Sequence, residues 1–303
     1  MLTDANMERR LKFCAGHVDQ SSMLFNAMED VIHVDEKLFY MTTVKRRYVL
    51  LPDEAAPTRR VRSKRHIPQV MVLAAVASPR TDPRTGSFFD GKIGLWAFLT
   101  HEPAQRSSRN RPAGALVPKE QPVNKSTYRE MLVERVLPAI KTKWPGATSG
   151  ERIVIQQDNA SPHISLDDAA LRAAVTASGC NVDLRFQPPN SPDLNVLDLS
   201  IFNAIQARQQ LDTASTLDEL VANVKRAHEE LPASTLNAAF LTLQCSMDSC
   251  VAAGGNNDFK PRHMAKAKME REGRLPRRIQ CSPATASFVR NQARFGGSHH
   301  SET

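Results

Sequence analysis

The sequence lacks the features that mark membrane-spanning, secreted or zinc-stabilised proteins. Its longest uninterrupted apolar run, Val70 to Ala77, is far shorter than the ~20 residues that a membrane-spanning helix needs. The segment Met1 to Arg10 is too polar for a signal peptide. The five cysteines are an odd number and form no CxxC pair, so they support neither a disulfide framework nor a zinc site. We therefore expect an intracellular protein with reduced thiols and no membrane contact.

The basic charge is segregated along the chain. The 303 residues carry a net charge of +8, and 41% hydrophobic and 24% charged residues are ordinary for a globular protein. Ten Lys/Arg stand against three Asp/Glu between Asp258 and Arg294, and eight against two between Lys45 and Arg65. Such clusters suit a polyanion-binding protein, because neutralising phosphates releases counterions. Solvated basic surfaces are the alternative, and charge alone favours nucleic acid only slightly.

Apolar patterns predict alternating strands and helices. The strands that we expect are short apolar or β-branched runs: Val31–Val34, Tyr48–Leu51, Ile67–Ala77, Gly91–Leu99, Arg152–Gln157 and Val182–Gln187. Helical spacing predicts the following helices: Leu11–Met28, Asn124–Trp144, Leu166–Ser178, Val196–Leu211, Leu217–Leu231 and Ser234–Ala252. Either Ser126 or Thr127 would cap the second of these helices. The strand–helix–strand order predicts a parallel α/β layer.

Three parts of the chain are distinguished by composition. We expect a helical linker remnant over 1–28, a catalytic domain over 29–254 and a basic, partly disordered tail over 255–303. The boundary before the tail is indicated by the sequence Gly254-Gly255-Asn256-Asn257. The tail has few large apolar residues and should lack a core of its own.

Three acids occupy positions that suit metal-dependent chemistry. Asp35 and Asp158 each follow a predicted buried strand, and Asp198 begins a helix after a proline turn. Ligands bind at the carboxyl ends of strands in open α/β sheets. Three converging carboxylates would repel one another unless a divalent cation such as Mg²⁺ lay between them. Taken singly, each acid is equally compatible with a structural role at a strand end or in a first helical turn.

The surrounding sequences resemble the three catalytic blocks of mariner-family transposases. The blocks are HVDEKLFYM from His33, QQDNASPH from Gln156 and QPPNSPDLNVLDLSIFNAIQ from Gln187. The resemblance is greatest to the plant-type mariner group, which has Asp as its third acid and thirty-nine residues between the second and third, as here. It extends from about Val31 to Pro283.

This resemblance implies an RNase H-like fold of the integrase and transposase superfamily, with a mixed central sheet flanked by helices. It implies that Asp35, Asp158 and Asp198 bind Mg²⁺ or Mn²⁺, with two ions expected. Such a site would hydrolyse a phosphodiester at a transposon end and then join the freed 3′-hydroxyl to target DNA. The partners would be double-stranded DNA and, by the same resemblance, a second copy in a homodimer. We expect a nuclear location.

Several residues of these blocks have alternative roles. Asn159 and His163 are candidate auxiliary residues, although for His163 we favour a structural histidine that caps the following helix. Asn195 and the nearby prolines are expected to fix the turn that delivers Asp198. Asp193, five residues earlier, is interpreted as a local backbone-bonding residue and not as the third acid.

Basic residues between the first two long strands are candidate DNA contacts. We rank a DNA-backbone contact first and a solvated loop second, with a nuclear-localisation patch as a further alternative. The candidates are Lys45, Arg46, Arg47, Arg59, Arg60, Arg62, Lys64 and Arg65. The aromatic residues Tyr40, Trp96 and Trp144 could stack on bases, but their apolar surroundings favour the core.

The family pattern also includes an N-terminal helix-turn-helix region that recognises transposon ends. Only about thirty residues precede the first catalytic strand here, so we expect this chain to lack most of that region. A catalytically silent, domesticated or truncated remnant that only binds DNA is therefore the alternative function. A host nuclease acting on RNA–DNA hybrids is a third hypothesis, and the match across all three blocks disfavours it.

Overall fold

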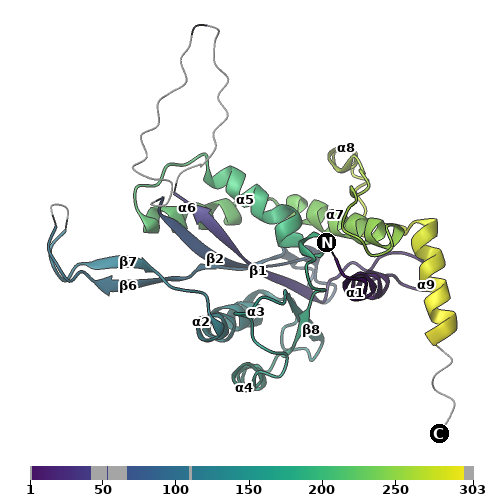
Figure 1. Cartoon of the computed structure of the whole chain (residues 1–303), viewed down its shortest axis with the longest axis horizontal. Coiled ribbons are helices and arrows are strands. Elements are labelled where there is room, and N and C mark those ends of the chain that lie inside the picture. The colour runs from purple at the N-terminus through teal and green to yellow at the C-terminus, as the bar shows by residue number, and fades with distance from the viewer. Residues whose placement is uncertain (1, 42–52, 54–66, 109–110, 297–303) are drawn as a thin grey trace.

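A five-stranded sheet forms the centre of the molecule (Figure 1). The computed structural model describes residues 2–41, 53, 67–108 and 111–296. In spatial order the strands are β5 (Lys92–Ala97), β2 (Gln69–Ala77), β1 (Val31–Tyr40), β8 (Arg152–Gln157) and β9 (Asn181–Phe186). The pairs β5–β2 and β2–β1 are antiparallel, whereas β1–β8 and β8–β9 are parallel. The sheet is therefore mixed.

Two short hairpins form separate two-stranded sheets. The first joins β3 (Arg80–Thr81) to β4 (Phe88–Phe89), and the second joins β6 (Leu99–Pro103) to β7 (Leu116–Glu120). The second hairpin projects away from the body of the molecule (Figure 1). The predicted strand Gly91–Leu99 is thus divided between β5 and β6, and the predicted strand Tyr48–Leu51 lies outside the described residues.

Helices cover both faces of the sheet, because both faces are apolar. Along β1, Ile32 and Val34 belong to one hydrophobic cluster, and Val31 and Phe39 belong to the other. The first face is covered by α2 (Lys125–Met131), α3 (Leu137–Lys143) and α4 (Ala169–Ser178). The second is covered by α1 (Asp4–Ala15), α5 (Phe202–Gln209), α6 (Leu217–Glu229), α7 (Ala233–Ala252) and α9 (Pro283–Gly296). The expected central sheet flanked by helices is confirmed.

Local hydrogen bonds set several helix ends differently from the predictions. Asn124, and not Ser126 or Thr127, caps α2, since its side chain accepts from the backbone amides of those two residues. The helix α4 begins at Ala169 because Asp168 accepts from the Leu171 amide. A π-helical turn, Leu132–Val136, connects α2 to α3.

The first predicted strand was too short and the first predicted helix was misplaced. β1 continues past Asp35 to Tyr40, because residues 36–40 pair with β2. In place of a helix over Leu11–Met28, α1 ends at Ala15, and the Asp19 side chain then accepts from the amides of two serines in a turn.

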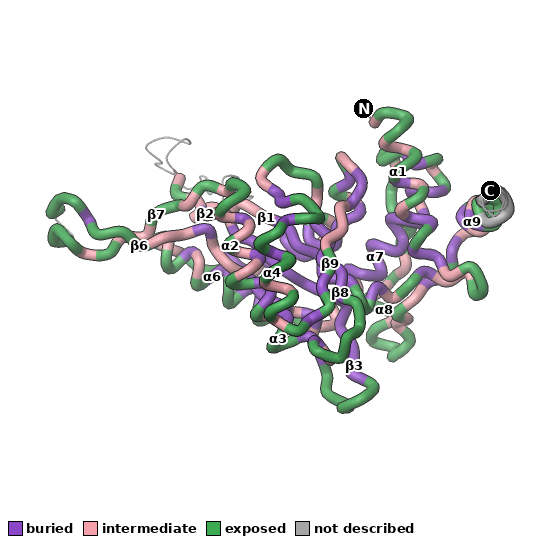
Figure 2. Tube along the Cα trace, turned by 90° about the horizontal axis from the view of Figure 1, so that it is seen from below, coloured by how far each residue is buried: buried purple, intermediate pink, exposed green. Residues whose placement is uncertain are grey.

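The two ends of the described chain pack onto the same core as the sheet. Cys14 of α1 and Ile279, Cys281 and Val289 of the C-terminal part belong to the hydrophobic cluster that contains α7. The short helix α8 (Lys266–Arg271) lies between α7 and α9 in the chain and has no buried residue. Figure 2 shows the buried positions concentrated at the sheet and its covering helices. Residues of both ends thus share the core of the sheet, in keeping with the expectation that the tail has no core of its own.

No helix in the described part of the chain is long and apolar enough to cross a membrane.

A buried ion pair connects α1 to the turn that precedes Asp198. The Arg10 side chain is fully buried and donates to both carboxylate oxygens of Asp193, at 2.7 and 2.6 Å. It also donates to the backbone carbonyl of Gly255 at 2.8 Å. The interpretation of Asp193 as a local backbone-bonding residue was wrong, because its partner is 183 residues away in the sequence.

Replacing Arg10 should destabilise the fold. Arg10→Ala would leave the Asp193 carboxylate without its partner, and breaking such a buried pair costs ~3 kcal/mol or more. Urea denaturation followed by circular dichroism measures the change. The exposed neighbour Arg9 provides the control, because Arg9→Ala should change the free energy of unfolding by less than ~0.5 kcal/mol. Equal effects of the two substitutions would contradict the assignment.

Acid should destabilise the protein through three buried histidines. Burial lowers the pKa of His33 to about 3 and those of His17 and His228 to about 4. In the unfolded chain histidine has a pKa near ~6.5. Their contribution to the free energy of unfolding is therefore fully present above pH ~6.5 and is lost as the pH falls toward 4. Urea midpoints measured between pH 6.5 and 5 should decrease.

His17→Gln should make this decrease shallower, and the same change at the exposed His263 should not. A pH dependence that is identical in the wild type and in His17→Gln would contradict the role given to burial.

Candidate active site

The strand register brings Asp35 and Asp158 to the same level of the sheet. The parallel pairing of β1 with β8 joins Val31 to Val154 and His33 to Gln156. With the same offset, Asp35 is level with Asp158, which follows the last residue of β8. Both acids therefore lie where the pairing of β1 with β8 ends. For Asp158 this agrees with the prediction that it lies at the carboxyl end of a strand. Asp35 lies in the middle of its strand, and only its pairing with β8 has ended there.

Asp198 reaches the same region from a helix start. The turn before it contains Asn190 with a φ of 54° and a short 3-10 helix, Pro192–Leu194. Asp198 then lies in the π-helical turn Leu197–Ile201, which continues into α5. Such single π-turns are frequent at functional sites. Asp158 and Asp198 line one cleft of about 290 Å³, together with residues 187–192 of the proline turn.

The three carboxyl groups influence one another. Burial raises the pKa of Asp35 to about 9, and the negative charges of Asp198, Glu36 and Asp158 contribute. Burial also raises the pKa of Asp198, although a hydrogen bond with Asp35 opposes this. At neutral pH Asp35 therefore holds a proton. The cluster contains more negative charge than its burial tolerates.

Asn195 holds the Asp35 side chain in place. Its amide donates to Asp35 Oδ2 at 2.9 Å, and its Oδ1 accepts from the Leu197 amide at 3.0 Å. Asn195 thus joins the third block to the first, in addition to fixing the turn as expected. The amide nitrogen of Asn159 donates to the Gln187 carbonyl at 2.6 Å, which connects the ends of β8 and β9.

His163 contacts two acids and does not cap a helix. Its Nδ1 lies 2.7 Å from Asp158 Oδ1, and its Nε2 lies 3.1 Å from Glu36 Oε2. The ring is stacked on Tyr128 with a centroid separation of 4.2 Å. The favoured interpretation of His163 as a helix cap was therefore wrong.

This pairing shifts the pKa values of both partners. Burial would lower the pKa of His163, but hydrogen bonds to Asp158 and Glu36 raise it to about 10. Burial would raise the pKa of Asp158, but hydrogen bonds from His163 and from the Ala160 amide lower it. An imidazolium thus lies between Asp158 and Glu36 and offsets part of their negative charge, and Asp158 is oriented toward it.

The carboxylates are not yet arranged as a complete metal site. Over residues 2–41, 67–108 and 111–296, no three His, Cys, Asp or Glu side chains are placed so that they could hold one metal ion. Asp35 and Asp198 contact each other, whereas Asp158 is engaged by His163. The donor set nevertheless fits Mg²⁺ or Mn²⁺, since clustered carboxylates are the ligands of hard divalent cations.

Other predicted site residues have different outcomes. The basic candidates between Lys45 and Arg65 lie outside the described residues. Trp144 is buried in the core as expected, whereas Tyr40 and Trp96 are only partly buried. Three residues around the acids were missed, namely Glu36, Tyr128 and Arg10. Glu36 could have been suspected from its position next to Asp35, but no sequence signal links the others to the site.

No family model matches this chain, and no curated protein matches it. Several solved structures are similar to it. The Mos1 mariner paired-end complex with Mn superposes with a TM-score of 0.61 and 18% identity, over 86% of this chain and 65% of that one. The Mos1 strand transfer complex gives a TM-score of 0.60 at 17% identity, over 86% of this chain and 64% of that one. The catalytic domain of Mos1 mariner transposase gives 0.55 at 16% identity, over 86% and 98%.

This chain thus spans about 65% of the length of the Mos1 chains in the complexes and nearly all of the isolated catalytic domain. At these identities the similarity establishes the fold. The chain has the RNase H-like fold of the Mos1 catalytic domain, as its sequence blocks predicted.

Proposed function

We propose that this chain is the DNA-cleaving and strand-transferring domain of a mariner-type transposase. The observation that supports this most is the meeting of Asp35, Asp158 and Asp198, from three separate blocks, where β1 and β8 part. The fold shared with the catalytic domain of Mos1 mariner transposase adds to it. The plant-type mariner group is proposed from the third Asp and its spacing.

Asp35, Asp158 and Asp198 would hold Mg²⁺ or Mn²⁺, and two ions are proposed. Mos1 structures are described with Mn and with Mg. Bound cations would make water nucleophilic at neutral pH and stabilise charge on the attacking and leaving oxygens. The excess of negative charge around Asp35 supports the proposal, because a cation would offset it and release the Asp35 proton.

The surrounding side chains would position these carboxylates. Asn195 restrains Asp35, and Asn159 fixes the backbone that carries Asp158. The imidazole of His163 contacts Asp158 on one side and Glu36 on the other. Asp158 would therefore have to rotate away from the imidazole to share a cation with Asp35 and Asp198. His163 would therefore act as a positioning residue and not as a metal ligand.

Double-stranded DNA, as transposon end and as target, is the proposed substrate. Neighbouring structures include a Mos1 paired-end complex with left transposon end. The basic segment Lys45–Arg65 and the basic C-terminal part would contact the phosphate backbone. A homodimer is proposed from the paired-end complexes, and a nuclear location is proposed from the sequence resemblance alone.

A DNA-binding remnant without catalysis is the second candidate. It is favoured by the absence, among the described residues, of three side chains already arranged around one metal position. The two candidates differ in whether divalent metal produces cleavage.

A nicking assay on supercoiled plasmid DNA tests the proposed function. With Mn²⁺ or Mg²⁺ the wild type should nick the plasmid, and Asp158→Ala should reduce the rate by at least ~100-fold. Asp167→Ala is a matched control, because Asp167 is highly exposed and lies in the same loop region. It should retain the wild-type rate.

Metal-independent nicking, or DNA binding without nicking in every variant, would contradict the nuclease. Preferential cleavage of an RNA–DNA hybrid in competition with plasmid DNA would favour the third hypothesis, a host nuclease.

Loss of the imidazole should change the metal requirement of the reaction. His163→Gln removes the contact that restrains Asp158, and changes of this kind typically alter metal affinity by ~10–100-fold. We expect the Mn²⁺ concentration for half-maximal nicking to shift in that range while the folded content by circular dichroism is unchanged. His101→Gln, on the projecting hairpin, is the control. An unchanged Mn²⁺ requirement would contradict the positioning role.

A further inference from the structure

The strand β5 has an open edge. Within the described part of the chain it pairs with β2 on one side, and no strand pairs with its other side. An open edge presents unpaired backbone N–H and C=O groups, which another extended segment can bind. The acids of the candidate active site on β1 and after β8 lie two and three strands away, so this edge is distinct from them.

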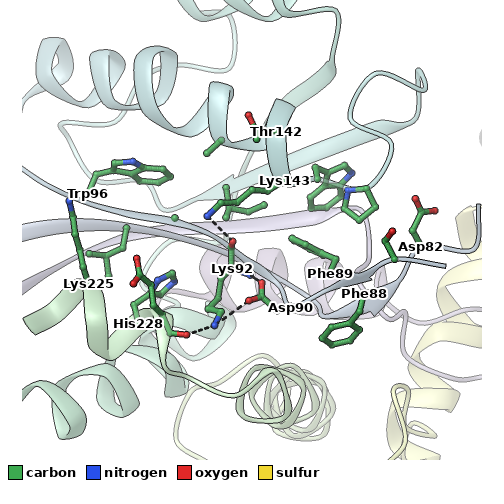
Figure 3. A pocket seen from close by; sticks show the side chains of 18 of the residues that line it. Asp82, Phe88, Phe89, Asp90, Lys92, Trp96, Thr142, Lys143, Lys225 and His228 are labelled. Carbon is green, nitrogen blue, oxygen red and sulfur yellow. Dashed lines mark hydrogen bonds and ion pairs between the residues drawn. The ribbon is translucent and has the colours of Figure 1, made fainter. Parts of the chain in front are cut away.

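A groove runs along this edge. Every residue from Lys92 to Trp96 lines it, and its volume is about 1070 Å³. Figure 3 shows α3 on one side of the strand, carrying Thr142 and Lys143, and α6 on the other, carrying Lys225 and His228. Two helices that cover opposite faces of the sheet therefore extend beyond its edge and form the walls.

The groove contains polar groups that favour a peptide backbone over a purely apolar ligand. The carbonyl of Lys92 accepts a long bond of 3.5 Å from Lys143 Nζ. His228 is 4% exposed, and its buried Nε2 has no hydrogen-bond partner in the structure. A buried polar atom without a partner is costly, and a bound backbone could supply one.

Apolar surfaces lie at both ends of the groove. The Trp96 ring lies over Gly94, where an added Cβ would come within 2.3 Å of a ring carbon, so glycine is needed there. At the other end Phe88 is 62% exposed. Alternate apolar side chains of an extended segment would pack against these rings.

The charges favour an acidic side chain beside α3. Of the acids that line the groove, Asp90 pairs with Lys92 and Asp82 with Arg84, while Glu229 lies on the α6 side. Lys143 has no acidic partner among the described residues, and it is exposed. A carboxylate of a bound segment could therefore pair with Lys143.

We propose that the β5 edge binds an extended, acidic segment of a partner protein, which adds to the sheet as a sixth strand. Backbone pairing with β5 provides the affinity, and the contacts with Trp96 and Lys143 select apolar residues alternating with an acid. This site is independent of the proposed nuclease function.

The probe is a synthetic seven-residue peptide, acetylated and amidated, that alternates valine with glutamate. Both tryptophans of the chain line the groove, so their fluorescence reports on it alone. We expect a saturable fluorescence change, and we expect amide exchange at Leu95, whose N–H faces away from β2, to slow by ~10-fold or more at saturation. Lys143→Glu should weaken binding by ~2–5-fold, as for one exposed ion pair, and Lys141→Glu on the same helix should not.

A peptide with N-methylated backbone amides separates strand pairing from nonspecific adsorption. It should not bind, because it cannot form the ladder of hydrogen bonds. The proposal is overturned if the N-methylated peptide binds equally well, if the fluorescence does not change at millimolar peptide, or if exchange in β5 is unaffected. Equal weakening by Lys143→Glu and Lys141→Glu would overturn the assigned role of Lys143.

Discussion

The repulsion between carboxyl groups held together where β1 and β8 part is the constraint on which the rest of this structure depends. The sheet register fixes Asp35 level with Asp158, and the proline turn brings Asp198 to them. Burial and the neighbouring negative charges raise the pKa of Asp35 to about 9, so Asp35 retains a proton at neutral pH. The site therefore has a strong electrostatic preference for positive charge, which suits a divalent cation.

Contacts from other parts of the fold hold the carboxyl groups in place although they repel one another. Asn195 donates to Asp35, His163 offsets part of the charge of Asp158 and Glu36, and Arg10 of α1 binds Asp193 in the turn. These contacts come from the N-terminal helix, from β1 and from both later blocks. Part of the free energy of folding thus offsets the cost of holding acids that would otherwise separate. Such a cost to stability is common at active sites.

Much of the fold could be predicted because its signals are local. β8 was predicted with its observed bounds, since its β-branched run is short and bounded by polar residues. β1 was predicted too short, because the polar Glu36 and Lys37 pair with β2, and a single segment does not reveal its partner strand. The roles of Arg10, His163 and Asp193 depend on residues more than a hundred positions apart, so only the folded chain shows them.

Proton release on metal binding tests the central claim most directly. Calorimetric titration of the metal-free protein with Mn²⁺ at pH 7, in buffers of different ionisation enthalpy, measures both binding and protons released. The account predicts binding with close to one proton released, and loss of that release in Asp35→Asn. Absence of Mn²⁺ binding at millimolar concentrations, or binding that is unchanged in Asp35→Asn, would contradict it.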